Sequence, residues 1–564
     1  MAGNNQVQEE LIYKKLRKRG KMNKRINIYL PVLIALSVIV GILLGNKLSK
    51  HQTRGLENFS IQSPNKLNTI IDLIANAYVD SVSTSKLVEE AIPGLLKNLD
   101  PHTTYIPADD MQGVTEEMQG NFGGIGVQFS IHKDTVQVVD VVSGGPSYKL
   151  GILPGDRIVA VNDSVIAGKG IKNEDVLHLL RGEKGTKVKV GIKRKGIRDL
   201  MQYAIVRGDI PIISVDVSYM IDNRTGFVKV SRFGEKTYDE FMEAMNKLDQ
   251  QGAQKIIIDL RGNPGGYLMA VVKMVNEFLN DGEAILYTEG HSQPRKTYTA
   301  TNKGKWIDKD VFVLIDEYSA SASEIFAGAI QDNDRGVIVG RRSFGKGLVQ
   351  EQIPFNDGSA LRLTVARYYT PSGRCIQKSY EEGSEEYYHD IMNRAVHGEF
   401  EVADSIHFAD SLKYETRTGR TVYGGGGIMP DYFVPLDTTG YSDYYSKITS
   451  KTLVYNYALE YSDKNRDRLK QLKTASDFTD YLSRQHILDQ FVSYAARQGV
   501  KKDDAGLKIS GKIIETQIMS YIARNIIGEE GFFPIIRQID STLQKAIEIS
   551  ESKESVEQIL AVTK

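Results

Sequence analysis

The sequence contains a single cysteine, Cys375, among its 564 residues, which excludes an internal disulfide framework and a cysteine-rich zinc site. The H-E-x-x-H motif of many zinc hydrolases is also absent. Basic and acidic residues both number 71, and this lack of net positive charge argues against a nucleic-acid-binding protein. With 41% apolar and 25% charged residues, the chain has the composition of a globular protein, and its length suggests about four domains.

The charges are unevenly distributed near the N-terminus. Residues 1–28 hold eight Lys or Arg and two Glu, and residues 28–45 form an uncharged run of 18 residues. As a helix this run would reach roughly 27 Å, close to the ~30 Å hydrocarbon core of a bilayer. Because flanking basic residues stay in the cytoplasm, we predict a cytoplasmic basic segment over 1–27 and a single-pass anchor in the inner (cytoplasmic) membrane over 28–47. The rest of the chain would then be extracytoplasmic (periplasmic).

A cleaved signal peptide is the alternative to this anchor. Such a peptide usually has a shorter apolar region that ends in an A-x-A-like cleavage site. Residues 43–47 read Leu-Leu-Gly-Asn-Lys and offer no such site. The sequence therefore favours an uncleaved helix.

Hydrophobic periodicity divides the remainder into four parts. Residues 61–118 have helical spacing, and residues 119–208 read as a compact β-rich module with one helix at 173–180. Residues 209–437 alternate between strands and helices, which predicts a layered α/β domain, with buried strands at 255–260, 311–315 and 337–339 and helices at 267–279 and 320–331. Amphipathic segments predict an all-helical region over 438–564.

The densest cluster of chemistry-bearing residues lies within 311–350, where an apolar strand runs into a serine-rich turn that opens a helix. Ser319, Ser321 and Ser323 are candidate helix caps. One of them is alternatively a nucleophile, since a helix N-terminus supplies N–H groups where an oxyanion develops. Capping statistics alone favour the cap and do not select one serine.

Lys346 lies between two glycines in the same region. Residues 340–346 match the P-loop pattern G-x-x-x-x-G-K, but Gly347 replaces the required Ser or Thr, and residues 348–354 read as a strand rather than a helix. A Ser–Lys dyad instead needs a neutral amine, so the lysine pKa must fall from about 10.4 towards about 7–8 by burial. Gln350 is available four residues later to hold the amine without adding charge.

The run from Ser319 to Gln350 resembles the C-terminal processing peptidases, or tail-specific proteases. The family spacing of 25 residues between serine and lysine selects Ser321, and the glutamine four residues after the lysine matches Gln350. Further family motifs occur in the same order over about 370 residues, namely LDPHT at 99–103, GIGV at 124–127, GILPGD at 151–156, DLRGNPGG at 259–266, YTPSGR at 369–374 and GGIMPD at 426–431.

The resemblance implies a crotonase/ClpP-like layered α/β serine protease core with an inserted PDZ-like β domain. Ser321 would attack the scissile carbonyl, Lys346 would be the general base, and Gln350 would orient it. The backbone N–H groups of Ala322, Gly265 and Gly266 would form the oxyanion hole.

The resemblance also assigns the β-rich module to substrate recruitment. Its loop Gly124-Ile125-Gly126-Val127 would present N–H groups to the terminal carboxylate of a peptide, which would then pair along the following strand.

Histidine is absent from residues 311–350, which favours lysine as the base, although sequence distance leaves a remote histidine such as His291 as an alternative. His102, after Pro101, is predicted to be a local hydrogen-bonding residue rather than a base.

We therefore predict a membrane-anchored serine endopeptidase that acts on the accessible C-terminal regions of extracytoplasmic proteins and needs no metal or cofactor. A non-catalytic PDZ scaffold that holds protein tails is the alternative, and it is disfavoured because all three candidate catalytic residues are present. A third hypothesis makes the C-terminal helical region an adaptor or a surface for homo-oligomerisation.

Overall fold

The computed structural model of the protein describes residues 31–32, 34–44, 65–131, 134–301, 304–406, 408–552, 554 and 556–562. The chain divides into two units, Met1–Glu90 and Ala91–Lys564. In the first unit, helix α2 (Lys66–Ala77) begins where the side chain of Asn65 accepts the N–H of Asn68 at 3.3 Å. The next helix, α3 (Thr84–Leu96), runs across the division between the units.

The predicted membrane anchor is not supported by the described residues. Residues 31–32 and 34–44 are helical, and large apolar side chains such as Val32 and Leu43 are exposed there. No helix within the described ranges is both long and apolar enough to cross a bilayer. Residues 28–30, 33 and 45–47 of the predicted anchor, and the basic segment 1–27, lie outside the described residues.

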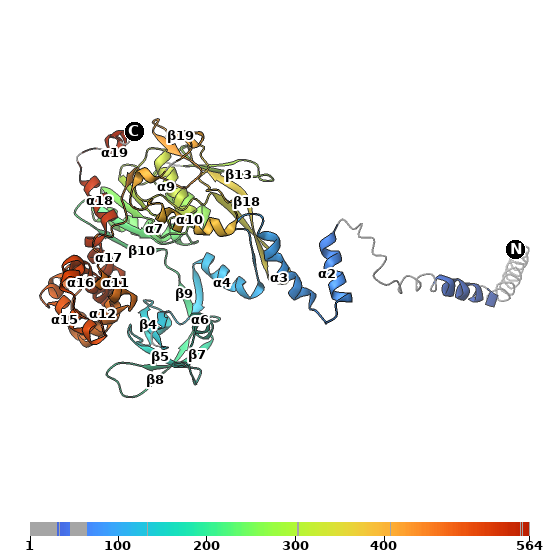
Figure 1. Cartoon of the computed structure of the whole chain (residues 1–564), viewed down its shortest axis with the longest axis horizontal. Coiled ribbons are helices and arrows are strands. Elements are labelled where there is room, and N and C mark those ends of the chain that lie inside the picture. The colour runs from blue at the N-terminus through green and yellow to red at the C-terminus, as the bar shows by residue number, and fades with distance from the viewer. Residues whose placement is uncertain are drawn as a thin grey trace, which may run out of the picture. The chain divides into compact units, whose positions relative to one another are not determined.

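A six-stranded antiparallel sheet forms the β-rich module (Figure 1). Its strand order is β3-β4-β5-β7-β8, with β6 beside β5, and β3 is therefore an edge strand. Apolar side chains of the sheet and of helix α6 share one core, which includes Val138, Ile158, Val176 and Val190. The elements are β3 (Val127–Ile131), β4 (Val136–Val141), α5 (Pro146–Lys149), β5 (Arg157–Val161), β6 (Ser164–Val165), α6 (Asn173–Leu180), β7 (Lys187–Lys193) and β8 (Met201–Val206).

A second six-stranded sheet, in the order β10-β11-β12-β15-β16-β21, is the centre of the α/β part. Neighbouring strands are parallel, except that β10 is antiparallel to β11. The inner strands are almost wholly apolar, as expected for strands covered on both faces. The strands are β10 (Val215–Met220), β11 (Thr225–Val230), β12 (Lys255–Asp259), β15 (Asp310–Ile315), β16 (Val337–Gly340) and β21 (Tyr432–Phe433).

Helices cover both faces of this sheet. Alternate strand residues such as Ile258 and Val313 pack against α7 (Thr237–Gln250), α8 (Leu268–Asn276) and α9 (Ala322–Asp332). The intervening residues, such as Ile257 and Phe312, pack against α18 (Ser541–Glu551) and α19 (Val556–Val562). The last two helices of the chain thus supply the third layer of the α/β part.

A third sheet has five strands, with β1, β18, β13 and β14 in order and β17 also paired with β18. Its strands are β1 (Thr104–Ile106), β13 (Ala284–Glu289), β14 (Lys296–Thr299), β17 (Leu348–Pro354) and β18 (Ala360–Tyr369). Two small ribbons pair β2 (Asn121–Gly124) with β9 (Gly208–Pro211) and β19 (Lys413–Glu415) with β20 (Thr421–Tyr423), and two helices, α4 (Ala108–Gln119) and α10 (Ser384–Val396), lie in the connections.

The remaining C-terminal helices form a separate hydrophobic core, which includes Tyr457, Phe478, Phe491 and Ile518. They are α11 (Asp443–Ser450), α12 (Leu453–Lys464), α13 (Arg466–Leu469), α14 (Ala475–Ser483), α15 (Ile487–Arg497), α16 (Asp504–Ile527) and α17 (Glu529–Ile536). The all-helical prediction after residue 437 therefore holds for the described residues. Two helices of this region, α18 and α19, do not join this helical core but belong to the core of the α/β part.

Candidate active site

Ser321 lies at the junction between strand β15 and helix α9, where its backbone has φ 54° and ψ −110°. Positive φ is costly for a residue with a Cβ atom and persists only where neighbouring contacts impose it. Here the Asn263 carbonyl oxygen accepts hydrogen bonds from Ala320 N–H at 3.0 Å and from Ser323 Oγ at 2.9 Å. The turn around Ser321 is thus fixed on both sides against the Gly262–Gly266 turn.

Glu324 connects the turn of Ser321 to the loop of Lys346. Its Oε2 atom accepts the backbone N–H groups of Ser321 and Lys346, both at 2.8 Å. Its Oε1 atom accepts Ser343 Oγ–H at 2.6 Å and Gly345 N–H at 2.7 Å. The side chain is fully buried, and burial raises its pKa to about 7 against the opposing effect of these hydrogen bonds.

Tyr368 provides a second connection between the same two residues. Its Oη atom lies 3.1 Å from the carbonyl oxygen of Ser321 and 2.9 Å from that of Lys346. One buried hydroxyl on strand β18 therefore contacts both backbones. The structure brings Ser321 and Lys346 together, although their sequence separation is large.

The side chain of Lys346 is oriented by Gln350. Lys346 Nζ donates to Gln350 Oε1 at 3.2 Å, and Gln350 Nε2 donates to the carbonyl oxygen of His102. Burial lowers the pKa of Lys346, and the positive charge of Arg362 lowers it further, while Glu324 and Asp100 act in the opposite direction. No hydrogen bond joins Lys346 Nζ to Ser321 Oγ, both of which belong to described residues.

The ring of His102 interacts with Tyr387 rather than with the candidate nucleophile. His102 Nε2 lies 2.9 Å from Tyr387 Oη, and burial together with the charge of Lys346 lowers the pKa of His102 to about 4. His102 contributes to the site through its backbone carbonyl oxygen, which accepts a hydrogen bond from Gln350 Nε2. His291, the remote alternative base, is exposed after β13 and forms no hydrogen bond with Ser321.

Gly265, one of the three predicted oxyanion donors, lies beside Ser321. A Cβ atom on Gly265, which has φ 99°, would lie 2.7 Å from Ser321 Cβ and 2.9 Å from Ala322 N, so only glycine fits there. The Gly265 N–H already donates to Asn263 Oδ1 at 2.9 Å, because Asn263 folds back on its own turn. In the described part of the chain, the N–H groups of Ala322 and Gly266 have no such acceptor.

The Gly124–Val127 loop lies at the start of edge strand β3. Its Ile125 side chain is buried, and the carbonyl oxygens of Ile125 and Gly126 accept the N–H groups of Ser147 and Val142, both at 3.0 Å. These bonds direct the two loop carbonyls toward the segment 142–147. The loop therefore leads directly into a strand whose outer edge carries no neighbouring strand in this sheet.

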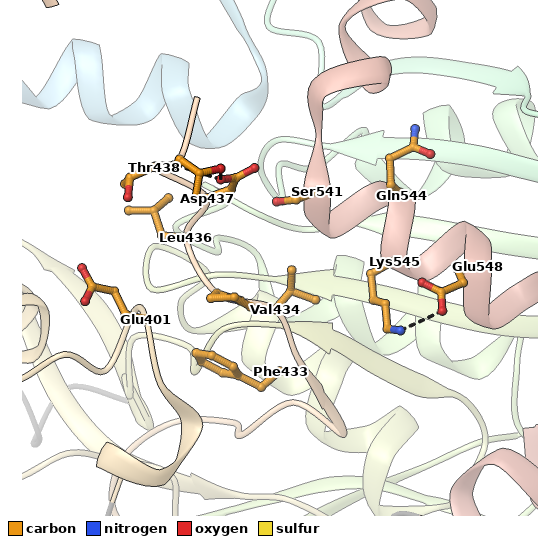
Figure 2. Close-up of a pocket in the computed structure, with 12 residues that line it drawn as sticks. Glu401, Phe433, Val434, Leu436, Asp437, Thr438, Ser541, Gln544, Lys545 and Glu548 are labelled. Atoms are coloured by element: carbon orange, nitrogen blue, oxygen red, sulfur yellow. Dashed lines mark hydrogen bonds and ion pairs between the residues drawn. The ribbon is translucent and has the colours of Figure 1, made fainter. Parts of the chain in front are cut away.

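A pocket of about 810 Å³ lies between the segment Phe433–Thr439 and helix α18 (Figure 2). Figure 2 shows Lys545 and Glu548 of α18 on the opposite side of it from Val434. None of its lining residues belongs to the candidate active site. Among the described residues, no group of three His, Cys, Asp or Glu side chains is placed to hold a metal ion.

Comparisons with known proteins assign the parts of this geometry to families. Residues 224–383 match peptidase family S41, residues 123–202 match the PDZ domain, and residues 44–110 match the N-terminal domain of the activating protease CtpB. The chain is 36% identical to a carboxy-terminal-processing protease of Bartonella bacilliformis over 332 residues, which cover 56% of this chain and 75% of that protein. The chain belongs to the C-terminal processing peptidases of family S41.

Two further relatives are similar to this chain. The carboxy-terminal processing protease CtpA of Bacillus subtilis is 35% identical, and the match covers 56% of this chain and 66% of CtpA. A solved photosystem II D1 C-terminal processing protease is 27% identical over 55% of this chain and 89% of its own, with a TM-score of 0.32. Residues 444–528 match a family of unknown function. The S41 processing peptidases are serine peptidases, and this one carries a PDZ domain.

Sequence reasoning missed Glu324, Tyr368 and the carbonyl of His102. Ser321 and Glu324 form the S-x-x-E pattern of a capping box, which could have indicated a carboxylate folded back on the turn. Tyr368 and His102 had no such local signal, since their contacts with the site join segments far apart in the sequence.

Proposed function

We propose that this S41 peptidase cleaves proteins with a Ser321–Lys346 dyad. The neutral amine of Lys346 takes the Ser321 hydroxyl proton as Oγ attacks the scissile carbonyl, and the N–H groups of Ala322 and Gly266 stabilise the resulting oxyanion. Collapse of the tetrahedral intermediate transfers the proton to the leaving amine. Lys346 then activates the water that hydrolyses the acyl-enzyme.

The observation that carries this proposal is the joint attachment of the two residues. The N–H groups of Ser321 and Lys346 share one oxygen of Glu324 at 2.8 Å, while Gln350 holds the lysine amine. Burial lowers the pKa of that amine, which favours the form able to accept a proton.

We further propose that the PDZ domain recruits the C-terminal tails of extracytoplasmic proteins. Ile125 and Gly126 would direct N–H groups to the terminal carboxylate, and the peptide would add to the free edge of β3. We also propose a single-pass anchor over 28–47, a periplasmic location and homo-oligomerisation through the helical region. The proposed domains are 61–118, 119–208, 209–437 and 438–564, except that α18 and α19 are assigned to the protease core.

A reactive-serine label tests the catalytic assignment directly. A fluorophosphonate should modify the native protein once, at Ser321, because only a hydroxyl with a nearby base and oxyanion donors reacts readily. Peptide mapping by mass spectrometry locates the adduct, and Ser323→Ala serves as the matched control that should still be labelled. Labelling of Ser321→Ala to the same extent would remove Ser321 from the mechanism and favour the scaffold alternative.

The pH dependence of cleavage should follow a lysine rather than a histidine. Because the base acts as a neutral amine, kcat/KM should rise with pH as Lys346 loses its proton, with an inflection below the ordinary lysine value of 10.5. Ionisation of Glu324, with a pKa of about 7, contributes in the same direction. Since the pKa of His102 is about 4, the side-chain substitution His102→Gln should leave the profile above pH 5 unchanged. A bell-shaped profile that loses one limb in this variant would contradict the assignment.

A further inference from the structure

Arg261 joins the protease core to the N-terminus of α18. Its Nε and Nη2 atoms donate to the two oxygens of Asp259 at 3.0 and 2.7 Å. Its Nη1 and Nη2 atoms donate to the two oxygens of Asp540 at 2.8 and 2.7 Å. One guanidinium is therefore held in bidentate fashion by two carboxylates, of which one comes from the far end of the sequence.

A second cation also contacts Asp259. Lys229 Nζ lies 3.3 Å from Asp259 Oδ1 and donates to the carbonyl oxygen of Arg261. The Asp259 side chain is 2% exposed and that of Arg261 19% exposed, so water screens these interactions little. Although burial opposes its ionisation, the Arg261 and Lys229 charges lower the pKa of Asp259 to about 2. Removing Asp540 would leave Arg261 with one carboxylate partner in place of two.

Arg261 stands at the start of the turn that faces the candidate nucleophile. Directly before it, the Leu260 carbonyl accepts Ser319 Oγ–H at 2.9 Å; directly after it, Gly262 N–H donates to Asp316 Oδ1 at 2.9 Å. The chain then continues to Gly265 and Gly266, beside Ser321. Arg261 therefore lies between two residues that are hydrogen-bonded to the segment leading to Ser321.

Asp540 is itself held firmly in place. It is the N-cap of α18, where its Oδ1 atom also accepts Leu543 N–H at 3.0 Å. Leu543, Ala546 and Ile549 of the same helix are buried against the central sheet. Helix α18 thus presents a carboxylate of fixed position to Arg261, and this carboxylate belongs to a segment outside the S41 match over 224–383.

We propose that Asp540 is a positioning residue of the peptidase reaction, which acts through Arg261 to hold the Gly262–Gly266 turn in the geometry that presents its N–H group to the oxyanion. This inference rests on the proposed function of that turn. It assigns part of the oxyanion site to the C-terminal helical region and makes α18 a component of the catalytic unit.

The substitution Asp540→Ser separates this role from helix capping, because serine is a good N-cap but is too short to reach both Arg261 nitrogens. Two controls belong to the same region. Thr474→Ala removes the cap of α14, where Thr474 accepts Asp477 N–H at 3.2 Å, and Glu530→Gln removes the exposed ion pair with Lys247 at 3.1 Å. Both controls should cleave fluorophore-labelled denatured β-casein as the wild-type enzyme does.

In Asp540→Ser we expect kcat per labelled active site to fall about tenfold, with KM within about twofold, because a misdirected oxyanion donor affects the transition state more than substrate binding. Inhibition by a peptidyl boronate, which forms a tetrahedral adduct, should weaken by a similar factor. A merely structural role would lower the thermal midpoint and the number of labelled sites without changing these two quantities.

If Asp540→Ser matches Thr474→Ala in kcat and in boronate affinity, Asp540 has no positioning role. That result would leave the proposed function intact, provided that Ser321→Ala is inactive in the same assay. Cleavage by Ser321→Ala would instead contradict the proposed function itself, so the two failures are distinguishable.

Discussion

Ser321→Ala, Lys346→Arg and the double variant should all lower kcat by about the same factor, on the order of 10⁶. The nucleophile and its base act as one unit, so the loss of either removes the whole nucleophilic path and the second substitution costs little more. Arginine keeps the positive charge of Lys346 but stays protonated in proteins. Loss of activity in Lys346→Arg would therefore identify proton acceptance, rather than charge, as the role of residue 346.

The measurement is steady-state cleavage of denatured casein, with tail binding followed separately by fluorescence anisotropy of a labelled peptide. Ser321→Ala should still bind the peptide, because the PDZ domain is not altered. Lys273→Arg, on the exposed side of α8, is the matched control and should remain fully active. Independent losses that multiply in the double variant would show that the two residues do not share one step.

Glu324→Gln should inactivate the enzyme by about 100-fold and destabilise it by about 3 kcal/mol. The carboxylate offers four acceptor positions to four donors, two on each oxygen. Glutamine has nearly the same shape, but its NH₂ group would face two of those donors. The turn of Ser321 and the loop of Lys346 would then lose their common attachment.

Urea unfolding and casein cleavage measure the two parts of this prediction. Glu277→Gln is the matched control, since Glu277 at the end of α8 accepts one donor on each oxygen, Tyr238 Oη–H at 2.7 Å on Oε1 and Lys305 N–H at 3.3 Å on Oε2, and Gln keeps one acceptor oxygen. Ser343→Ala removes one of the four donors and should show a smaller effect than Glu324→Gln. Wild-type activity in Glu324→Gln would show that the two segments are held together by other contacts.

Local elements of the fold were predictable because their signals are contained within short segments. The strand at 348–354 and the helix at 173–180 were predicted with the limits that the structure has. The helical region predicted after residue 437 is divided by breaks that were not predicted, for example at Thr452 between α11 and α12, where φ is 52°. Hydrophobic periodicity continues across such short breaks and does not reveal them.

Which part of the protein each apolar helix face packs against could not be predicted in the same way. Leu543 and Ile549 have the same spacing that a helical bundle would require, yet they pack on the central sheet. In the site, the 25-residue spacing selected Ser321, and the lysine–glutamine contact follows from a separation of four residues. The pairing of Gly265 N–H with Asn263, and the part of Glu324, depend on a three-dimensional turn that composition and period do not encode.

The third layer of the α/β part has a consequence for how the enzyme is made. Protein synthesis proceeds from the N-terminus, and domains generally fold as units once their residues have emerged. Phe312 and Leu314 in the middle of the chain are covered by Ile549, Ile559 and Leu560 near its end. The nascent chain thus carries its nucleophile long before the sheet beneath it is covered, and this face of the sheet gains its apolar partners only after residues 543–560 have been synthesised.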